Sequence, residues 1–169
     1  MLEIGSGTGQ HAAYFAPEMP WLTWHPSDVE EHLPGIRQWV EEAGADNLRL
    51  PIVLNVEDRW PALSVDAAYS ANTCHIMSWP HVERMFQGVA QCISQGGVFC
   101  VYGPFSYGGR HTSESNARFD AMLRARDPQS GLRDFEAIAA LALKHGMAKE
   151  EDTPMPANNR LLVFRSRER

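Results

Sequence analysis

Short apolar runs alternate with amphipathic segments along the first hundred residues. The runs at 2–4, 21–25, 51–56, 65–71 and 98–102 predict five strands, and the last of these is apolar throughout, as in a strand buried on both faces. The segments at 10–16, 33–43 and 80–93 predict helices, of which Pro17 and Pro20 end the first and Gly44 ends the second. A stripe at helical spacing assigns four residues of the second helix to the core: Ile36, Trp39, Val40 and Ala43.

The pattern changes after residue 102. A polar stretch at 106–116 predicts a loop over the end of the fifth strand, followed by a helix that Thr112 or Ser113 caps. Asp134 is placed to cap a last helix at 135–145, and residues 147–153 and 160–167 predict two antiparallel strands whose connection is too rich in proline for a tight hairpin. The whole pattern predicts an α/β fold with a mostly parallel sheet, an antiparallel C-terminal strand pair and helices on both faces.

Composition narrows the class of protein. The 169 residues suffice for a single domain, with 44% hydrophobic and 21% charged residues. A net charge of −6 argues against a nucleic-acid partner, and no apolar run approaches the roughly 18 residues of a membrane span. Three cysteines in apolar segments fit reduced thiols in a cytoplasmic protein.

The candidate chemistry begins at the first strand. Its carboxylate, Glu3, is followed by glycines at positions 5, 7 and 9. The dinucleotide fingerprint G-x-G-x-x-G fails here, because counting from Gly5 puts Gln10 where the third glycine belongs. The pattern E-x-G-x-G-x-G resembles instead motif I of class I S-adenosylmethionine (SAM) dependent methyltransferases. The alternative is a glycine-rich turn of another α/β protein.

That resemblance implies a SAM site and a Rossmann-like class I methyltransferase fold. The cofactor contacts that it implies in the first loop come from Glu3, Gly5, Ser6, Gly7, Gly9 and His11. Asp28 stands 19 residues after Gly9, at the end of the second strand, where a carboxylate accepts both ribose hydroxyls, although Ser27 or Asp28 would also serve as a helix cap. The resemblance places the adenine at the turn after the third strand, near Asn55 and Val56, and Asn72 follows the fourth strand at the same edge of the sheet.

Four side chains near the ends of the fourth and fifth strands are candidates for the chemistry of transfer: His75, Tyr102, His111 and Asn116. His75 is the first candidate for a general base, because imidazole titrates near neutrality. Each has a structural alternative: His75 as a wall of the cofactor pocket, Tyr102 in the core and His111 as a helix cap. The histidines lack zinc-ligand spacing, so no metal is expected, and Cys74 and His75, as neighbours on a strand, would point to opposite faces.

Longer segments resemble the methyltransferase-like 26 family of small methyltransferase-like proteins. The resemblance rests on LEIGSGTGQH, WHPSD, NTCHIMSW, VYGPFSYGGRHTSESNARFDAMLRARDPQSGLRDFE and MPANN. It implies a SAM-dependent methyltransferase of a small molecule; the alternatives are a SAM-binding protein without transferase activity and a protein methyltransferase. Members of the family carry an upstream segment, and more often have Asp where this chain has Asn55. We therefore expect residues 1–169 to form one SAM-binding domain without the upstream segment.

Overall fold

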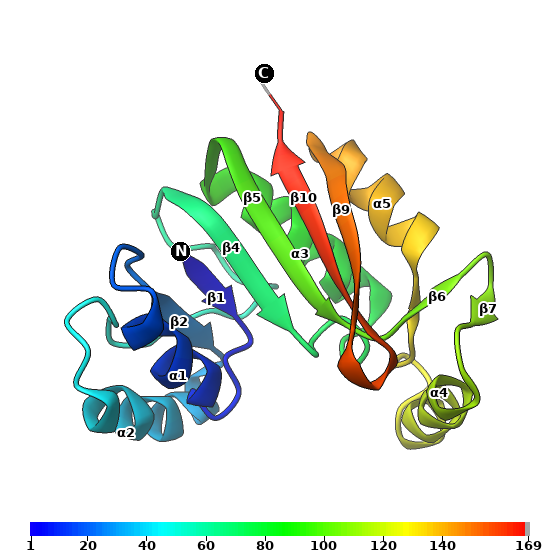
Figure 1. Ribbon diagram of the computed structural model, residues 1–169, viewed down its shortest axis with the longest axis horizontal. Coiled ribbons are helices and arrows are strands. Elements are labelled where there is room, and N and C mark those ends of the chain that lie inside the picture. Colours follow the sequence, from blue (N-terminus) through cyan, green and yellow to red (C-terminus); the bar gives the residue numbers. More distant parts are fainter. Residues whose placement is uncertain (168–169) are drawn as a thin grey trace.

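A seven-stranded sheet forms the centre of the computed structural model, which describes residues 1–167. The strand order is β3-β2-β1-β4-β5-β10-β9 (Figure 1). The strands are β1 (Leu2–Ile4), β2 (His25–Asp28), β3 (Ile52–Val53), β4 (Val65–Ala71), β5 (Ile93–Gly103), β9 (Met147–Met155) and β10 (Asn159–Ser166). The pairs from β3 to β5 are parallel, whereas β10 runs antiparallel to β5 and to β9. The predicted mostly parallel sheet with an antiparallel C-terminal pair is confirmed.

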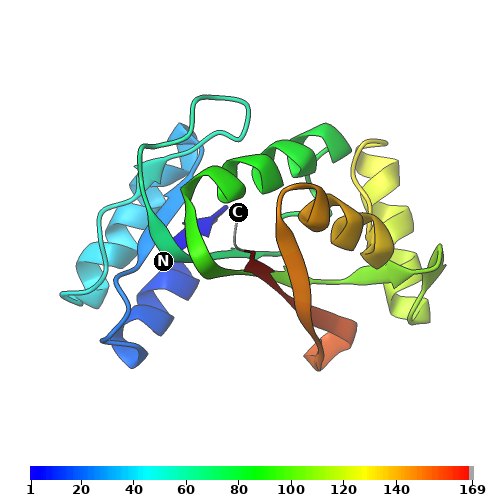
Figure 2. The same cartoon turned by 90° about the horizontal axis from the view of Figure 1, so that it is seen from above.

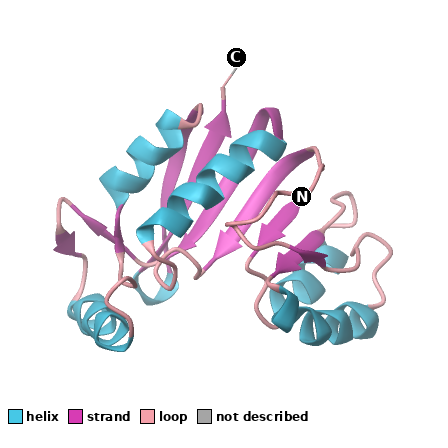
Figure 3. Cartoon of the chain, turned by 180° about the vertical axis from the view of Figure 1, so that it is seen from behind, coloured by secondary structure: helices cyan, strands magenta, loops and turns pink. Residues whose placement is uncertain are grey.

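Helices cover the two faces of this sheet unequally. Helices α3 (Trp79–Cys92) and α5 (Phe135–Lys144) lie on one face (Figures 2 and 3). There Phe86 of α3 contacts Phe99 and Phe164 edge to face. Helix α1 (Gln10–Glu18) lies on the other face, with α2 (Leu33–Ala43) and the single-turn helix η1 (Glu30–His32) beside it. A second core cluster forms there around Trp24 and Ile36. The sheet therefore separates two hydrophobic cores, as the predicted architecture requires.

The polar stretch at 106–116 is more ordered than a loop. It forms a hairpin of β6 (Phe105–Tyr107) and β7 (Arg110–His111), and β8 (Arg133–Asp134) pairs with β6 to complete a small sheet. The turn of the hairpin is held by carboxylates, because Gly108 N–H donates to Glu136 and Gly109 N–H donates to Asp134. Helix α4 (Glu114–Arg126) follows with Ser113 as its N-cap.

Four sequence-based boundaries were wrong. The second strand begins at His25 instead of residue 21, because Trp24 makes only a bridge to Leu48 while its indole enters the core. Only Ile52–Val53 of the predicted 51–56 strand pairs with β2. Pro17 lies inside the last turn of α1, and β5 begins directly after α3.

One side chain assigned to the core lies at the surface: Trp39 of α2 is 37% exposed, since the buried face of this helix is narrower than its apolar stripe.

Candidate active site

A cavity opens where the strand order reverses between β1 and β4, at the carboxyl ends of the parallel strands. Open α/β sheets bind their ligands at this point. The cavity measures about 390 Å³, within the range of roughly 300–1,000 Å³ that is usual for small-molecule sites. Its lining comes from the glycine-rich loop, α1, the end of β2, η1 and the segment after β4: Gly5, Ser6, Gly7, Thr8, Gln10, His11, Asp28, His32, Ala71, Asn72, Thr73 and Ile76.

Two glycines of this loop have left-handed backbones for different reasons. Gly5 has φ of +72°, and a Cβ placed on it would stand 2.8 Å from Thr73 Oγ1. Gly7 also has a left-handed backbone, with φ of +60°, yet nothing lies within 4 Å of the position of its Cβ. The first glycine thus permits close packing between two loops, and the second leaves bare backbone facing the cavity.

Glu3 holds the glycine-rich loop in place by buried hydrogen bonds and does not line the cavity. Its Oε2 accepts hydrogen bonds from Ser6 Oγ at 2.9 Å and from Trp24 Nε1 at 3.0 Å. Burial raises the pKa of the Glu3 carboxyl, and the two donors oppose that rise. Ser6 Oγ in turn accepts the N–H of Ser27, so β1, the glycine-rich loop and β2 are tied together.

Asp28 joins the loop to the end of β2. Its Oδ2 accepts the N–H of Gly7 at 2.7 Å, and its Oδ1 accepts the N–H of Val29 and contacts His32 Nδ1 at 2.9 Å. The helix-cap alternative is not what the structure has, because the side chain makes no capping bond to η1 or α2. A carboxylate offers about four lone-pair sites, so acceptor capacity remains toward the cavity.

The four candidates for transfer chemistry gather at the same edge of the sheet, outside the wall of this cavity. His75 is 6% exposed, and its ring contacts Phe119 of α4 edge to face. Burial, and then the charge of Arg133, lower the pKa of His75 to about 4, so the imidazole is neutral at physiological pH. Arg133 also fixes the loop around this histidine by donating to the carbonyls of Cys74 and Met77.

The other three candidates belong to hydrogen-bonded contacts around α4 and β5. Asn116 Nδ2 donates to Thr112 Oγ1 and to the carbonyl of Asn158. His111 Nε2 lies 3.5 Å from Asp120 Oδ2 of α4. Tyr102 Oη accepts a hydrogen bond from Asn159. The connection between β9 and β10, coming from the far end of the sequence, thus joins the site (Figure 1).

The predicted cofactor residues divide into two groups. Gly5, Ser6, Gly7, His11, Asp28 and Asn72 line the cavity, whereas Glu3, Gly9, Asn55 and Val56 do not. Asn55 Oδ1 accepts the N–H of Glu57 and so stabilises its own turn. Sequence reasoning missed six lining residues: Thr8, Gln10, His32, Ala71, Thr73 and Ile76. Only His32 carried a usable signal, since it is a polar side chain four residues after Asp28, in the turn that follows β2.

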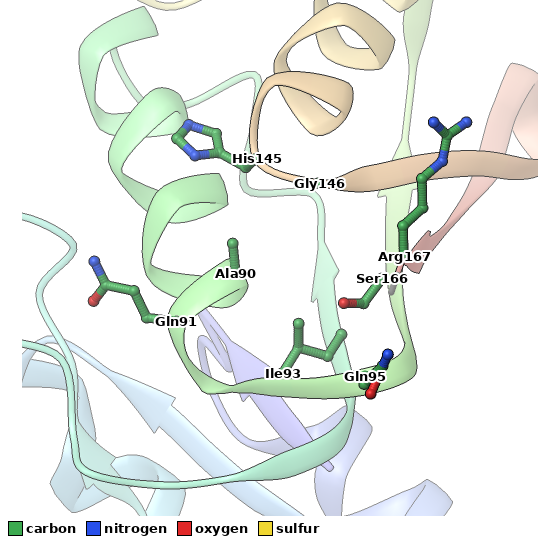
Figure 4. A pocket seen from close by; sticks show the side chains of 8 residues that line it. All are labelled: Ala90, Gln91, Ile93, Gln95, His145, Gly146, Ser166 and Arg167. Carbon is green, nitrogen blue, oxygen red and sulfur yellow. The ribbon is translucent and has the colours of Figure 1, made fainter. Parts of the chain in front are cut away.

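Other candidate chemistry receives little support. Burial raises the pKa of the Cys74 thiol to about 12, so it is no nucleophile at neutral pH. Within residues 1–167 no group of His, Cys, Asp and Glu could hold a metal ion, and no helix there is long and apolar enough to cross a membrane. A larger cavity of about 500 Å³ lies at the opposite edge of the sheet, between Ile93, His145 and Arg167, and contains none of the predicted site residues (Figure 4).

Comparison with solved structures identifies the fold as that of class I methyltransferases. The chain superposes on an O-methyltransferase family protein from Burkholderia thailandensis with a TM-score of 0.87 and 15% identity, covering 99% of this chain and 50% of that one. An O-methyltransferase family 2 protein from Planctomyces limnophilus, in complex with apigenin, superposes with a TM-score of 0.84 and 16% sequence identity. The match covers 97% of this chain and 49% of that one. The SAM-dependent methyltransferase SibL superposes with a TM-score of 0.84 and 20% sequence identity, covering 99% of this chain and 50% of that one. The chain spans about half the length of these structures.

The chain itself belongs to the family described as protein of unknown function (DUF938), whose model matches residues 1–166. One curated relative shows local similarity only. A tRNA (guanine-N(7)-)-methyltransferase from Acidithiobacillus ferrooxidans is 43% identical over 53 residues, which are 30% of this chain and 22% of that protein.

Proposed function

We propose that the chain is a single SAM-binding domain that transfers a methyl group to a small molecule. The observation that carries the proposal is the cavity at the β1–β4 switch point, in which the open backbone of Gly7 faces the carboxylate of Asp28. The likeness of the fold to that of SAM-dependent methyltransferases supports this proposal. We propose further that the chain is related to the methyltransferase-like 26 family and acts in the cytoplasm.

The residues present fit the cofactor. When bound, SAM supplies an electrophilic methyl group on a sulfonium. Asp28 is the acceptor for ribose hydroxyls, and the bare backbone at Gly7 leaves room for the amino-acid part. Asn72 adds an amide to the cavity wall at the end of β4. Binding of this kind mainly positions the reactants, which accounts for a large share of the rate enhancement in two-substrate reactions.

Removal of the proton of an acceptor falls to His75 in this proposal. The imidazole is held neutral by burial and by the neighbouring charge of Arg133, so it is in the form that can accept a proton at physiological pH, while its lowered pKa makes it a weak base. Phe119 and the bonds from Arg133 keep the loop that carries it in one conformation. His111 and Asn116 support the α4 wall beside it.

A small-molecule acceptor is preferred over the alternatives. The similarity to the tRNA methyltransferase is confined to 53 residues, and a net charge of −6 opposes the phosphate contacts that dominate nucleic-acid binding. A protein methyltransferase and a SAM-binding protein without activity remain separate hypotheses that turnover assays distinguish.

Calorimetry with SAM, S-adenosylhomocysteine and NAD tests the cofactor. We expect binding of the first two and none of NAD, because the glycine spacing departs from the dinucleotide fingerprint at Gln10. Preferential binding of NAD would overturn the proposal. Release of S-adenosylhomocysteine in the presence of a small-metabolite extract, and not in its absence, would then separate an enzyme from a binding protein.

A further inference from the structure

Tyr102 lies one strand away from the cavity and on the same face of the sheet. It is the penultimate residue of β5 and is paired in register with Ala71 of β4 on one side and with Leu161 of β10 on the other. Ala71 lines the cavity, and neighbouring parallel strands are about 4.8 Å apart. Tyr102 and the cavity-lining Ala71 are therefore direct neighbours across adjacent strands, with their side chains on the same face of the sheet.

The amide of Asn159 determines which way the Tyr102 hydroxyl points. Asn159 Nδ2 lies 3.1 Å from Tyr102 Oη and 3.2 Å from the carbonyl oxygen of Pro156. A carbonyl oxygen only accepts, so the amide nitrogen must face it, and the same nitrogen then donates to Tyr102. Because Tyr102 Oη is the acceptor in that bond, its own O–H is left to donate, and within residues 1–167 it donates to no protein group.

The turn between β9 and β10, which leads into Asn159, has a strained backbone of the kind found at active sites. Within the described residues, three non-glycine residues have positive φ, namely Asn72 at 55°, Ala157 at 58° and Asn158 at 59°. All three lie at the carboxyl edge of the parallel strands, two of them in the connection that carries Asn159. Conformations of this kind cost about 1 kcal/mol or more each and persist where the surroundings hold them, often at active sites.

Side chains of α4 hold the strained turn in place. Asn116 Nδ2 donates to the carbonyl of Asn158, and Asn158 Nδ2 donates to Ser115 Oγ. Asn116 is 5% exposed, whereas Asn158 lies at the surface, so the donor side of this bond is buried. The position of Asn159, and through it the direction of the Tyr102 hydroxyl, is thus set by contacts among three separate segments.

We propose that Tyr102 donates its hydroxyl proton in a hydrogen bond to the methyl-accepting atom, that Asn159 is the positioning residue for this bond, and that the acceptor is an oxygen. The inference rests on the proposed methyltransferase function. An oxygen nucleophile keeps a second lone pair for the methyl carbon while it accepts from Tyr102. An amine has one lone pair, which the same hydrogen bond would occupy.

The transfer balances with the groups at hand. An acceptor oxygen forms its new bond to the methyl carbon while the carbon–sulfur bond breaks and its electron pair stays on sulfur. The proton of the acceptor passes to the neutral imidazole of His75 or to water. Tyr102 keeps its own proton throughout, so its part is to orient the oxygen so that the remaining lone pair faces the methyl carbon.

Transfer from SAM carrying an isotopically labelled methyl group into a small-metabolite extract tests the inference. Mass spectrometry is expected to find the label in O-methyl products. Tyr102→Phe should lower incorporation roughly 10-fold or more, the effect of one lost hydrogen bond to a charged group. SAM affinity by calorimetry should stay unchanged. Tyr69→Phe is the matched control, because Tyr69 lies on the same sheet face but contacts Trp24 of the core.

Asn159 is tested through its dependence on Tyr102. Asn159→Ala removes the donor, while Asn159→Asp introduces a carboxylate that would accept a hydrogen bond from the Tyr102 O–H and so turn it away from the acceptor. The second variant should therefore lose more activity. Added to Tyr102→Phe, the Asn159→Asp change should cause little further loss, because both act on one hydrogen bond. Melting temperatures measured in parallel separate these effects from lost stability.

Three results would overturn the inference: label in N-methyl products only, full activity of Tyr102→Phe, or additive losses in the double variant. Failure of the underlying function looks different. If SAM binds with normal affinity but no label is transferred by the unmodified protein, the methyltransferase proposal falls and takes the inference with it. If label is transferred but Tyr102 is dispensable, only the inference falls.

Discussion

The carboxylate of Asp28 accepts the backbone N–H of Gly7 at 2.7 Å. One side chain thereby connects the end of β2 to the most open part of the glycine-rich loop. The same carboxylate lines the cavity, so the group that shapes the loop is also available to a ligand. Asp28 therefore both holds the loop in its conformation and can bind the ligand, and substitutions of Asp28 should affect both roles.

Asp28→Ala is expected to weaken SAM binding about 10-fold or more. A lost partner of a desolvated hydroxyl costs roughly 1–3 kcal/mol, and 1.4 kcal/mol corresponds to tenfold in affinity. Calorimetry gives the affinity, and the melting temperature reports the fold. Glu41→Ala, at an exposed position of α2, is the control. Unchanged affinity with a lowered melting temperature would mean that Asp28 only supports the loop.

Gly7→Ala should impair binding more than folding. Its Cβ would meet no protein atom within 4 Å, so the added methyl group projects into the open cavity. Gly44→Ala is a close control, since Gly44 has φ of +57° and is equally free of contacts, but ends α2. Both variants should lose about 1–2 kcal/mol of stability from the left-handed backbone. Equal SAM affinity in the two variants would show that Gly7 does not face the ligand.

Glu3→Gln separates organisation of the loop from contact with the cofactor. The pKa of Glu3 is raised by burial, so the folded chain binds its proton more tightly than the unfolded chain does. The free energy of unfolding contributed by Glu3 is therefore lost as pH rises from about 4.5 through the folded pKa. Glu3→Gln does not titrate there, so between pH 4 and pH 7 it should become increasingly more stable than the unmodified protein as pH rises. Thermal unfolding measured across this range would detect the difference.

SAM affinity of Glu3→Gln should change by less than about threefold, since an amide oxygen still accepts from Ser6 and Trp24. A large drop in affinity without a change in stability would indicate direct contact with the ligand.

Local signals in the sequence predicted elements well where one residue type decides the boundary. Gly44 ends α2 in a left-handed conformation, and the side chain of Asp134 accepts the N–H of Glu136 at the start of α5. Each outcome depends on a residue's own conformational or hydrogen-bonding preference. The strands that failed, near residues 21 and 51, depend on pairing partners that are distant in sequence.

The site shows the same division. The glycine-rich loop and Asp28 lie in the cavity wall because motif and spacing describe a local turn and the end of its neighbouring strand. Thr73 and Ile76 were missed because they reach the cavity only through the packing of the loop after β4. The hydrogen bond between Asn159 and Tyr102 joins residues 57 positions apart, and no local sequence pattern predicts it.

The buried imidazole of His75 should make stability fall at mildly acidic pH. Its pKa is lowered from 6.5 to about 4, first by burial and then by Arg133. Between those two values the unfolded chain binds more protons than the folded chain, so the free energy of unfolding is highest above about pH 6.5 and decreases as pH falls toward 4. The total decrease from this one group is at most about 3 kcal/mol.

His75→Gln removes the titrating ring and should flatten this part of the stability profile, whatever its effect on the melting temperature at neutral pH. His81→Gln, at the more exposed start of α3, is the matched control. Melting temperatures measured from pH 4 to pH 7 compare the slopes of the three proteins. If the slope of His75→Gln equals that of the unmodified protein, the ring is not held neutral by burial, and the argument for His75 as a neutral base at physiological pH loses its basis.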